Sequence, residues 1–104
     1  MGIKEDEKFI KSLDDNKALE EASEADVKKY KELVTKLSEK DNIVAMEALA
    51  HSSYGGDRAF ECNWELSEKL YHKLLKLTND TYYANTLGYI YYYGRTGKPD
   101  FNKA

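Results

Sequence analysis

Residues 49–56 read LAHSSYGG, and residues 87–94, which begin 38 positions later, read LGYIYYYG. Leucine, a small residue, tyrosine and glycine occupy the same relative places in both segments. Both segments close an apolar stretch with glycine, which is typical of a helix C-terminus followed by a turn. The comparison indicates an internal repeat whose unit contains a helix that ends at glycine.

The repeat continues beyond the glycine with an offset of 37 residues. Asn63 and Trp64 then correspond to Asp100 and Phe101, so a favoured N-cap residue precedes an aromatic residue in both copies. A period of 37 to 38 residues lies in the range of helical solenoid repeats. Each unit therefore reads as a helix, a glycine turn, a loop, an N-cap and a second helix.

Apolar residues recur at helical spacing along most of the chain. Their pattern predicts helices over residues 24–40, 43–54, 64–77 and 82–93. A fifth helix is expected after Asp100, with only its first four residues present. On the helix over residues 82–93, the face expected to meet the core comprises Ala84, Leu87, Gly88 and Tyr91.

Residues 1–22 have a weaker pattern and form a leader. Phe9, Ile10 and Leu13 can lie on one side of a short helix that ends near residues 14–16, and Leu19 can lie on a second short turn. A leader that is only partly ordered is the alternative.

Together these patterns predict an all-α protein, an α-α superhelix of the tetratricopeptide type. The chain divides into the leader, a capping helix over residues 23–41, a first repeat over 42–79 and a truncated second repeat over 80–104. That is about one and a half helix-pair repeats after an N-terminal helix or two. Stacked helix pairs share a continuous core, which a single pair cannot form.

The second copy also resembles a known family. The residues Leu87-Gly88, Tyr91, Gly94, Asp100 and Lys103-Ala104 resemble the Sel-one-like repeat, a relative of the tetratricopeptide repeat. In the first copy, Leu70-Tyr71 stands where the family has Trp-Tyr. The resemblance covers about residues 42–104. Its structural positions are Leu49, Ala50, Gly56, Trp64, Leu70, Tyr71, Leu87, Gly88, Tyr91, Gly94 and Asp100.

Three positions depart from the family pattern. Ser53 replaces an expected tyrosine, Leu74-Leu75 replaces an alanine pair, and Gly97 comes one position later than usual. The first two departures fall in the first copy, which is the less specific of the two.

The resemblance implies a solenoid that grips another protein or a peptide and is not an enzyme. Extracellular members carry a disulfide in each repeat, whereas this chain has one cysteine, Cys62, so it resembles the intracellular branch and a cytoplasmic location is expected. The second copy stops at Ala104, four residues into its second helix. We therefore expect a piece of a longer repeat protein, with self-association through the truncated end.

Charge and hydropathy argue against two classes of partner. The net charge is −3, and lysine and arginine are scattered among acidic residues instead of forming the basic stripe that nucleic-acid binding requires. No run approaches the roughly 18 apolar residues of a membrane span. Neither a nucleic acid nor a membrane is expected as a partner.

Few residues in the chain can carry chemistry. His51 and His72 lie 11 and 10 positions from Cys62, and these spacings match neither a helical ligand pair nor a compact cysteine motif. Cys62 has no base or oxyanion site at a telling spacing. No glycine-rich phosphate loop occurs. We expect no catalytic residue, no metal site and no cofactor.

Tyrosines are the most informative functional feature. Tyr82, Tyr89 and Tyr93 recur with Thr86 at positions i, i+4, i+7 and i+11, on the side of the helix opposite the expected core. In helical solenoids the first helices of successive units line the concave surface, and His51 occupies this face in the first unit. We expect a partner-binding site of His51, Tyr82, Tyr89 and Tyr93. The alternative is that these tyrosines pack against neighbouring repeats.

Three functions follow, in order of preference. The first is a non-catalytic scaffold or adaptor module for protein–protein interaction. The second is a structural segment of a longer multi-repeat protein, with no ligand of its own. The third is a small enzyme, which no sequence feature favours.

Overall fold

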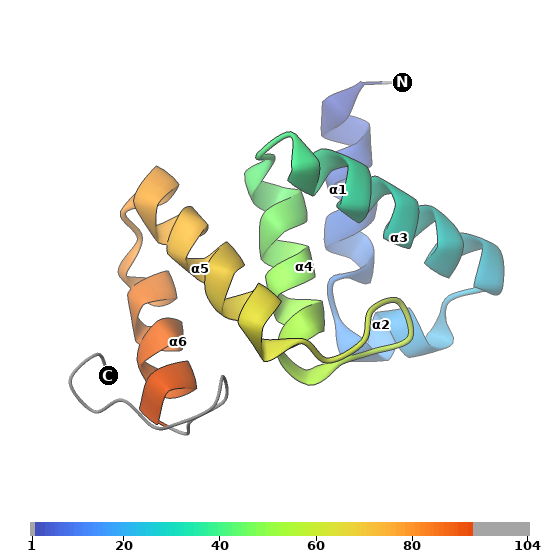
Figure 1. The fold of residues 1–104 in the computed structure, drawn as a ribbon. Helices are drawn as coiled ribbons and strands as arrows, with labels where there is room; N and C mark the ends of the chain where they lie inside the picture. Colours follow the sequence, from blue (N-terminus) through green and yellow to red (C-terminus); the bar gives the residue numbers. More distant parts are fainter. Residues whose placement is uncertain (1, 93–104) are drawn as a thin grey trace.

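The computed structural model describes residues 2–92, which form six α-helices and no strand (Figure 1). The all-α prediction is confirmed for this part of the chain. Tyr93, Gly94 and Asp100, the side chain of Tyr91 and the expected fifth helix lie outside the described residues. The helices are α1 (Ile3–Leu13), α2 (Asn16–Glu21), α3 (Glu24–Glu39), α4 (Ile43–Gly55), α5 (Trp64–Thr78) and α6 (Thr81–Tyr92).

Helices α3, α4 and α5 begin at the residues that the sequence predicts, each after a side-chain cap, and α6 begins at Thr81, one residue before the predicted start. Ser23 Oγ accepts a hydrogen bond from the Asp26 amide, and Asn42 and Asn63 make the equivalent contacts at α4 and α5. Each such cap stabilises its helix by about 1 kcal/mol. The cap residues are local in sequence, so these helix starts could be predicted.

The N-terminal residues are folded against the rest of the molecule. Ile10 on α1 and Leu19 on α2 are buried. Arg58, in the loop after α4, donates hydrogen bonds through Nη1 to the carbonyl oxygens of Leu19, Glu20 and Ala22, at 2.7, 2.9 and 2.8 Å. The leader thus contains two helices in this structure, and a residue from a distant loop helps to hold α2.

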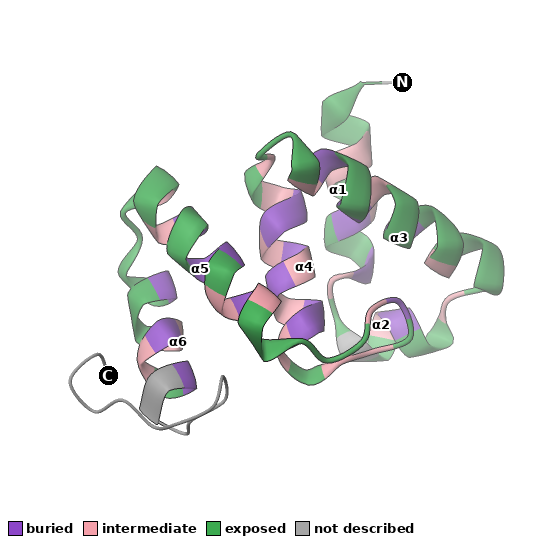
Figure 2. Cartoon of the chain, viewed as in Figure 1, coloured by how far each residue is buried: buried purple, intermediate pink, exposed green. Residues whose placement is uncertain are grey.

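Helix α4 lies between two apolar clusters (Figure 2). Ala45 and Ala48 contribute to the cluster shared with α1, α2 and α3, whereas Met46 and Ala50 contribute to the cluster shared with α5 and α6. Leu49 contacts both clusters. Small side chains suit this position, because partner helices approach α4 from both sides.

Helices α3 and α5 bury residues at the same relative positions, 37 residues apart. The equivalent buried pairs are Tyr30 and Ser67, Val34 and Tyr71, and Leu37 and Leu74. The two helices also end alike, because Asp41 and Asn79 both adopt left-handed backbone conformations, with φ of 61° and 58°. Asp41 and Asn79 are 38 positions apart, one more than the buried pairs.

The core-facing side of α6 differs from the expected one. Its buried residues are Tyr83, Leu87 and Ile90, whereas Ala84 is exposed and Gly88 is only partly buried. The large side chains fill the space against α5, and the Tyr83 ring lies 6.1 Å from the Tyr71 ring. With about 100° between successive residues, the Tyr82–Tyr89 stripe lies beside the buried face and not opposite it.

Two other repeat positions have clear structural roles. Gly56 has a φ of 77°, and a Cβ there would lie 3.0 Å from the backbone nitrogen of Cys62. Ala50 is buried where α4 crosses α5, and its carbonyl oxygen accepts a hydrogen bond from Ser67 Oγ at 3.0 Å. Trp64, by contrast, is partly exposed, and its Nε1 donates to the Tyr54 carbonyl oxygen at 2.7 Å.

Two alanine-to-leucine substitutions, one at a buried and one at an exposed position, test which alanines belong to the core. Ala50→Leu forces extra methyl groups between α4 and α5, so the free energy of unfolding should fall by about 1–3 kcal/mol. Ala84→Leu, on an exposed position of α6, should change it by less than about 0.5 kcal/mol. Urea unfolding followed by circular dichroism measures both. Equal effects of the two variants would contradict the burial described here.

Candidate functional site

His51 lies at the meeting point of three helices. Glu47 and His51 are four residues apart on α4 and therefore share one side of that helix. Asp14 is the C-cap residue of α1, which packs alongside α4 (Figure 1). His51 Nδ1 lies 3.4 and 3.3 Å from the two carboxylate oxygens of Asp14.

The other side of the His51 ring faces aromatic residues. Its Nε2 lies 3.3 Å from the hydroxyl oxygen of Tyr82 on α6. The rings of His51 and Tyr82 are arranged edge to face with centroids 6.4 Å apart, and the Tyr71 ring lies 6.2 Å from His51. His51, on α4, thus contacts both Asp14 at the end of α1 and Tyr82 on α6.

Glu47 completes the group. Its carboxylate accepts a hydrogen bond from the hydroxyl group of Tyr83. Asp14, Glu47 and His51 each offer one atom capable of binding a metal, and these three atoms lie within 4.8 Å of one another. We call Asp14, Glu47, His51, Tyr82 and Tyr83 the His51 cluster.

The charges in the His51 cluster follow from its contacts. The hydrogen bond with Asp14 raises the pKa of His51 above its ordinary value of 6.5, whereas burial acts in the opposite direction. Burial raises the pKa of Tyr83, and its hydrogen bond with Glu47 adds to the effect. Tyr83 therefore stays neutral at physiological pH and donates to the Glu47 carboxylate.

A polar cavity of about 240 Å³ adjoins the His51 cluster. Tyr30 lines it and is fully buried, which raises the pKa of its hydroxyl group to about 12. That hydroxyl group lies towards Ser52 but has no hydrogen-bond partner of good geometry among the described residues. The cavity is lined by Leu13, Asp14, Asp15, Leu19, Tyr30, His51, Ser52 and Asp57.

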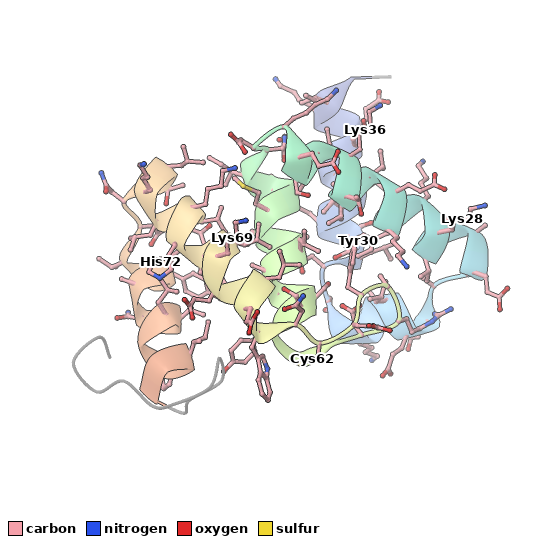
Figure 3. The ribbon with its side chains drawn as sticks, viewed as in Figure 1. Lys28, Tyr30, Lys36, Cys62, Lys69 and His72 are labelled. Carbon is pink, nitrogen blue, oxygen red and sulfur yellow. The ribbon has the colours of Figure 1, made fainter. Side chains whose placement is uncertain are left out.

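The other candidate residues lie apart from the cluster. Cys62 is exposed in the loop before α5, and His72 is exposed on α5 (Figure 3). Cys62 lines a larger hollow, of about 540 Å³, bordered by α3, α4 and the loop over residues 57–63. No described histidine lines that hollow, whose charged lining residues are Lys31, Asp57, Arg58 and Glu61.

Of the four residues expected to bind a partner, the structure brings His51 and Tyr82 into contact. Tyr89 lies two turns beyond Tyr82 on α6 and is exposed. Sequence reasoning missed Glu47 and Asp14. The four-residue spacing of Glu47 and His51 was a signal available in the sequence, whereas the position of Asp14 depends on how the leader folds.

Three comparisons with known proteins gave no relative. No protein-family model matches the chain, and neither the curated proteins nor the solved structures include a significant match.

The contact between His51 and Asp14 makes stability depend on pH. Because the pKa of His51 is raised on folding, its contribution is fully present below pH 6.5 and is lost as pH rises through the folded-state value. Asp14→Asn should therefore flatten the fall in unfolding free energy as the pH rises above 6.5, the ordinary pKa of histidine. Urea titrations with a chelator present measure this.

The matched comparison is His51→Gln, which removes the titrating imidazole and should flatten the pH dependence of stability as Asp14→Asn does. If the unfolding free energies of the wild type and Asp14→Asn change with pH in the same way, the contact with Asp14 does not shift the His51 pKa.

Proposed function

We propose that this chain is a non-catalytic module that holds a peptide segment of another protein. The binding surface is formed by His51 on α4 and by Tyr82 and Tyr89 on α6. One observation carries the proposal: Tyr82 and Tyr89 are 51% and 61% exposed, seven residues apart on one helix, and Tyr82 touches His51. Tyrosine is enriched at protein interfaces, because its ring is apolar and its hydroxyl group can bond to a partner.

The chemistry of tyrosine supports this surface. A tyrosine ring offers a large rigid contact area with few rotatable bonds, and its hydroxyl group can pair with the backbone of a bound peptide. The contact with His51 holds the Tyr82 ring against α4 before any partner arrives. A side chain that is already ordered loses less conformational entropy on binding.

The proposal includes a repeat architecture of the Sel-one-like kind. It is supported by the shared burial of α3 and α5 at an offset of 37 and by the similar ends of these two helices. In this arrangement α4 and α6 are the first helices of successive units, and their side chains line one surface. Self-association through the C-terminal copy concerns residues beyond those described.

The proposal names a protein partner and no nucleic acid or membrane. Within residues 2–92, no helix has both the length and the apolar character to cross a bilayer. The net charge of −3 provides no attraction for phosphate backbones. An intracellular, cytoplasmic setting belongs to the same proposal.

The test begins with a displayed library of random peptides selected against the whole chain. A selected peptide is then titrated by fluorescence anisotropy against variants. Tyr89→Ala should weaken binding by at least about 10-fold, because loss of an interface aromatic costs more than 1 kcal/mol. Tyr89→Phe, which keeps the ring, should retain most of the affinity.

The control is Leu77→Ala, which removes an exposed apolar side chain from α5. Its affinity should equal that of the wild type, with helicity unchanged in all variants. A library that yields no binder, or binders that tolerate Tyr82→Ala and Tyr89→Ala together, would rule out this surface.

A further inference from the structure

We propose that Asp14, Glu47 and His51 bind a divalent transition-metal ion of the zinc type. The inference shares His51 and Tyr82 with the proposed peptide surface, but it rests on other contacts, those of Asp14 and Glu47, so zinc binding and peptide binding can be tested separately. It begins from the convergence of three ligand atoms within 4.8 Å of one another, on residues from two helices. All three residues are partly buried.

The positions of the ligands suit a small ion. Glu47 and His51 lie one helical turn apart on α4, a spacing that directs two side chains to one point. Bonds of 2.0–2.1 Å in a tetrahedral site separate the ligand atoms by about 3.3 Å. The distances between His51 Nδ1 and the Asp14 oxygens are 3.3 and 3.4 Å, which match that separation and are long for a charged hydrogen bond.

The local charge also calls for a cation. Asp14 and Glu47 bring two carboxylates together in a partly buried place, and no lysine or arginine among residues 2–92 forms an ion pair with either. The ion pair between a lysine and a carboxylate in this part of the chain joins Lys73 to Asp41, away from the cluster. His51 is the one basic side chain in contact with this pair among the described residues, and a bound divalent ion would neutralise both carboxylates.

Outer residues hold the ligands in the orientation that a metal requires. The hydroxyl group of Tyr82 meets Nε2 of His51, which leaves Nδ1 directed towards the carboxylates. Tyr83 donates a hydrogen bond to Glu47. Hydrogen bonds of this kind to the second nitrogen of a histidine and to a ligating carboxylate are regular features of protein metal sites.

The adjoining cavity can supply the remaining ligands. Its volume of about 240 Å³ has room for several water molecules, and Asp14 and His51 form part of its wall. The buried hydroxyl group of Tyr30 on the same wall has no partner of good geometry among the described residues, so it can bond to such a water. Three protein ligands with water in an open position are typical of zinc sites that are not purely structural.

The ligand types discriminate between metals. Calcium and magnesium favour sites made entirely of oxygen ligands, whereas an imidazole favours zinc and its neighbours in the transition series. We therefore expect Zn²⁺ to bind more tightly than Mn²⁺, and Mg²⁺ not to compete with it.

Calorimetric titration of the whole chain with Zn²⁺, after treatment with a chelator, tests the proposal. One ion should bind per chain and raise the midpoint of thermal unfolding. His51→Gln, Glu47→Gln and Asp14→Asn should each weaken the binding of Zn²⁺ by at least about 10-fold. Circular dichroism identifies any variant that fails to fold, and the two carboxylate variants then carry the test.

The matched control is His72→Gln. Glu68 and His72 on α5 have the same four-residue spacing as Glu47 and His51, but no third ligand from another helix joins them among the described residues. This variant should bind Zn²⁺ as the wild type does, and so should Tyr89→Ala, which tests the peptide surface. Absence of zinc binding, or its persistence in His51→Gln, would overturn the proposal.

Discussion

The structure depends on the burial of α4 from two sides. Its alanines and Met46 meet α1, α2 and α3 on one side and α5 and α6 on the other. A helix with large side chains around its circumference would hold these neighbours too far apart for either cluster to close. The short side chains of α4 therefore set the distances on which the other helices depend. Burial from two sides also explains why apolar residues surround α4, which lacks the wide polar face of a surface helix.

The polar residues that α4 does carry are consequently held by partners. Glu47 and His51 lie on the side of α4 that faces Asp14 at the end of α1 and the first turn of α6, a region that we call the seam. Each of the two is bonded to a residue from one of these neighbours. Partly buried polar groups of this kind favour a single arrangement of the helices, because the bonds are lost if a helix shifts. The same restraint makes the seam suitable for a ligand, since its groups are already oriented.

Much of the fold could be predicted from local signals. Apolar spacing and the caps Ser23, Asn42 and Asn63 define three of the last four helices within a residue or two at each end. The packing of α1 and α2 against the rest of the molecule could not be predicted. Their partners lie far along the chain: Arg58 bonds to α2, and both helices pack against apolar residues of α3 and α4. The predicted core face of α6 was wrong because Gly88 was expected to lie where two helices approach closely. The residues that pack into the core are instead the large Tyr83 and Ile90. For the site, the sequence placed His51 with Tyr82 but gave no reason to include Asp14.

The account rests on α1 being docked against α4, since that contact brings Asp14 to His51. Amide hydrogen exchange of the native chain, read residue by residue, measures this most directly. We expect the amides of Ile10 and Leu13 to be protected to a degree comparable with those of Ala48 and Ala50, because all four residues are buried in the clusters that α4 joins. Exchange of the α1 amides at the rate of an unfolded chain, while α4 stays protected, would contradict it.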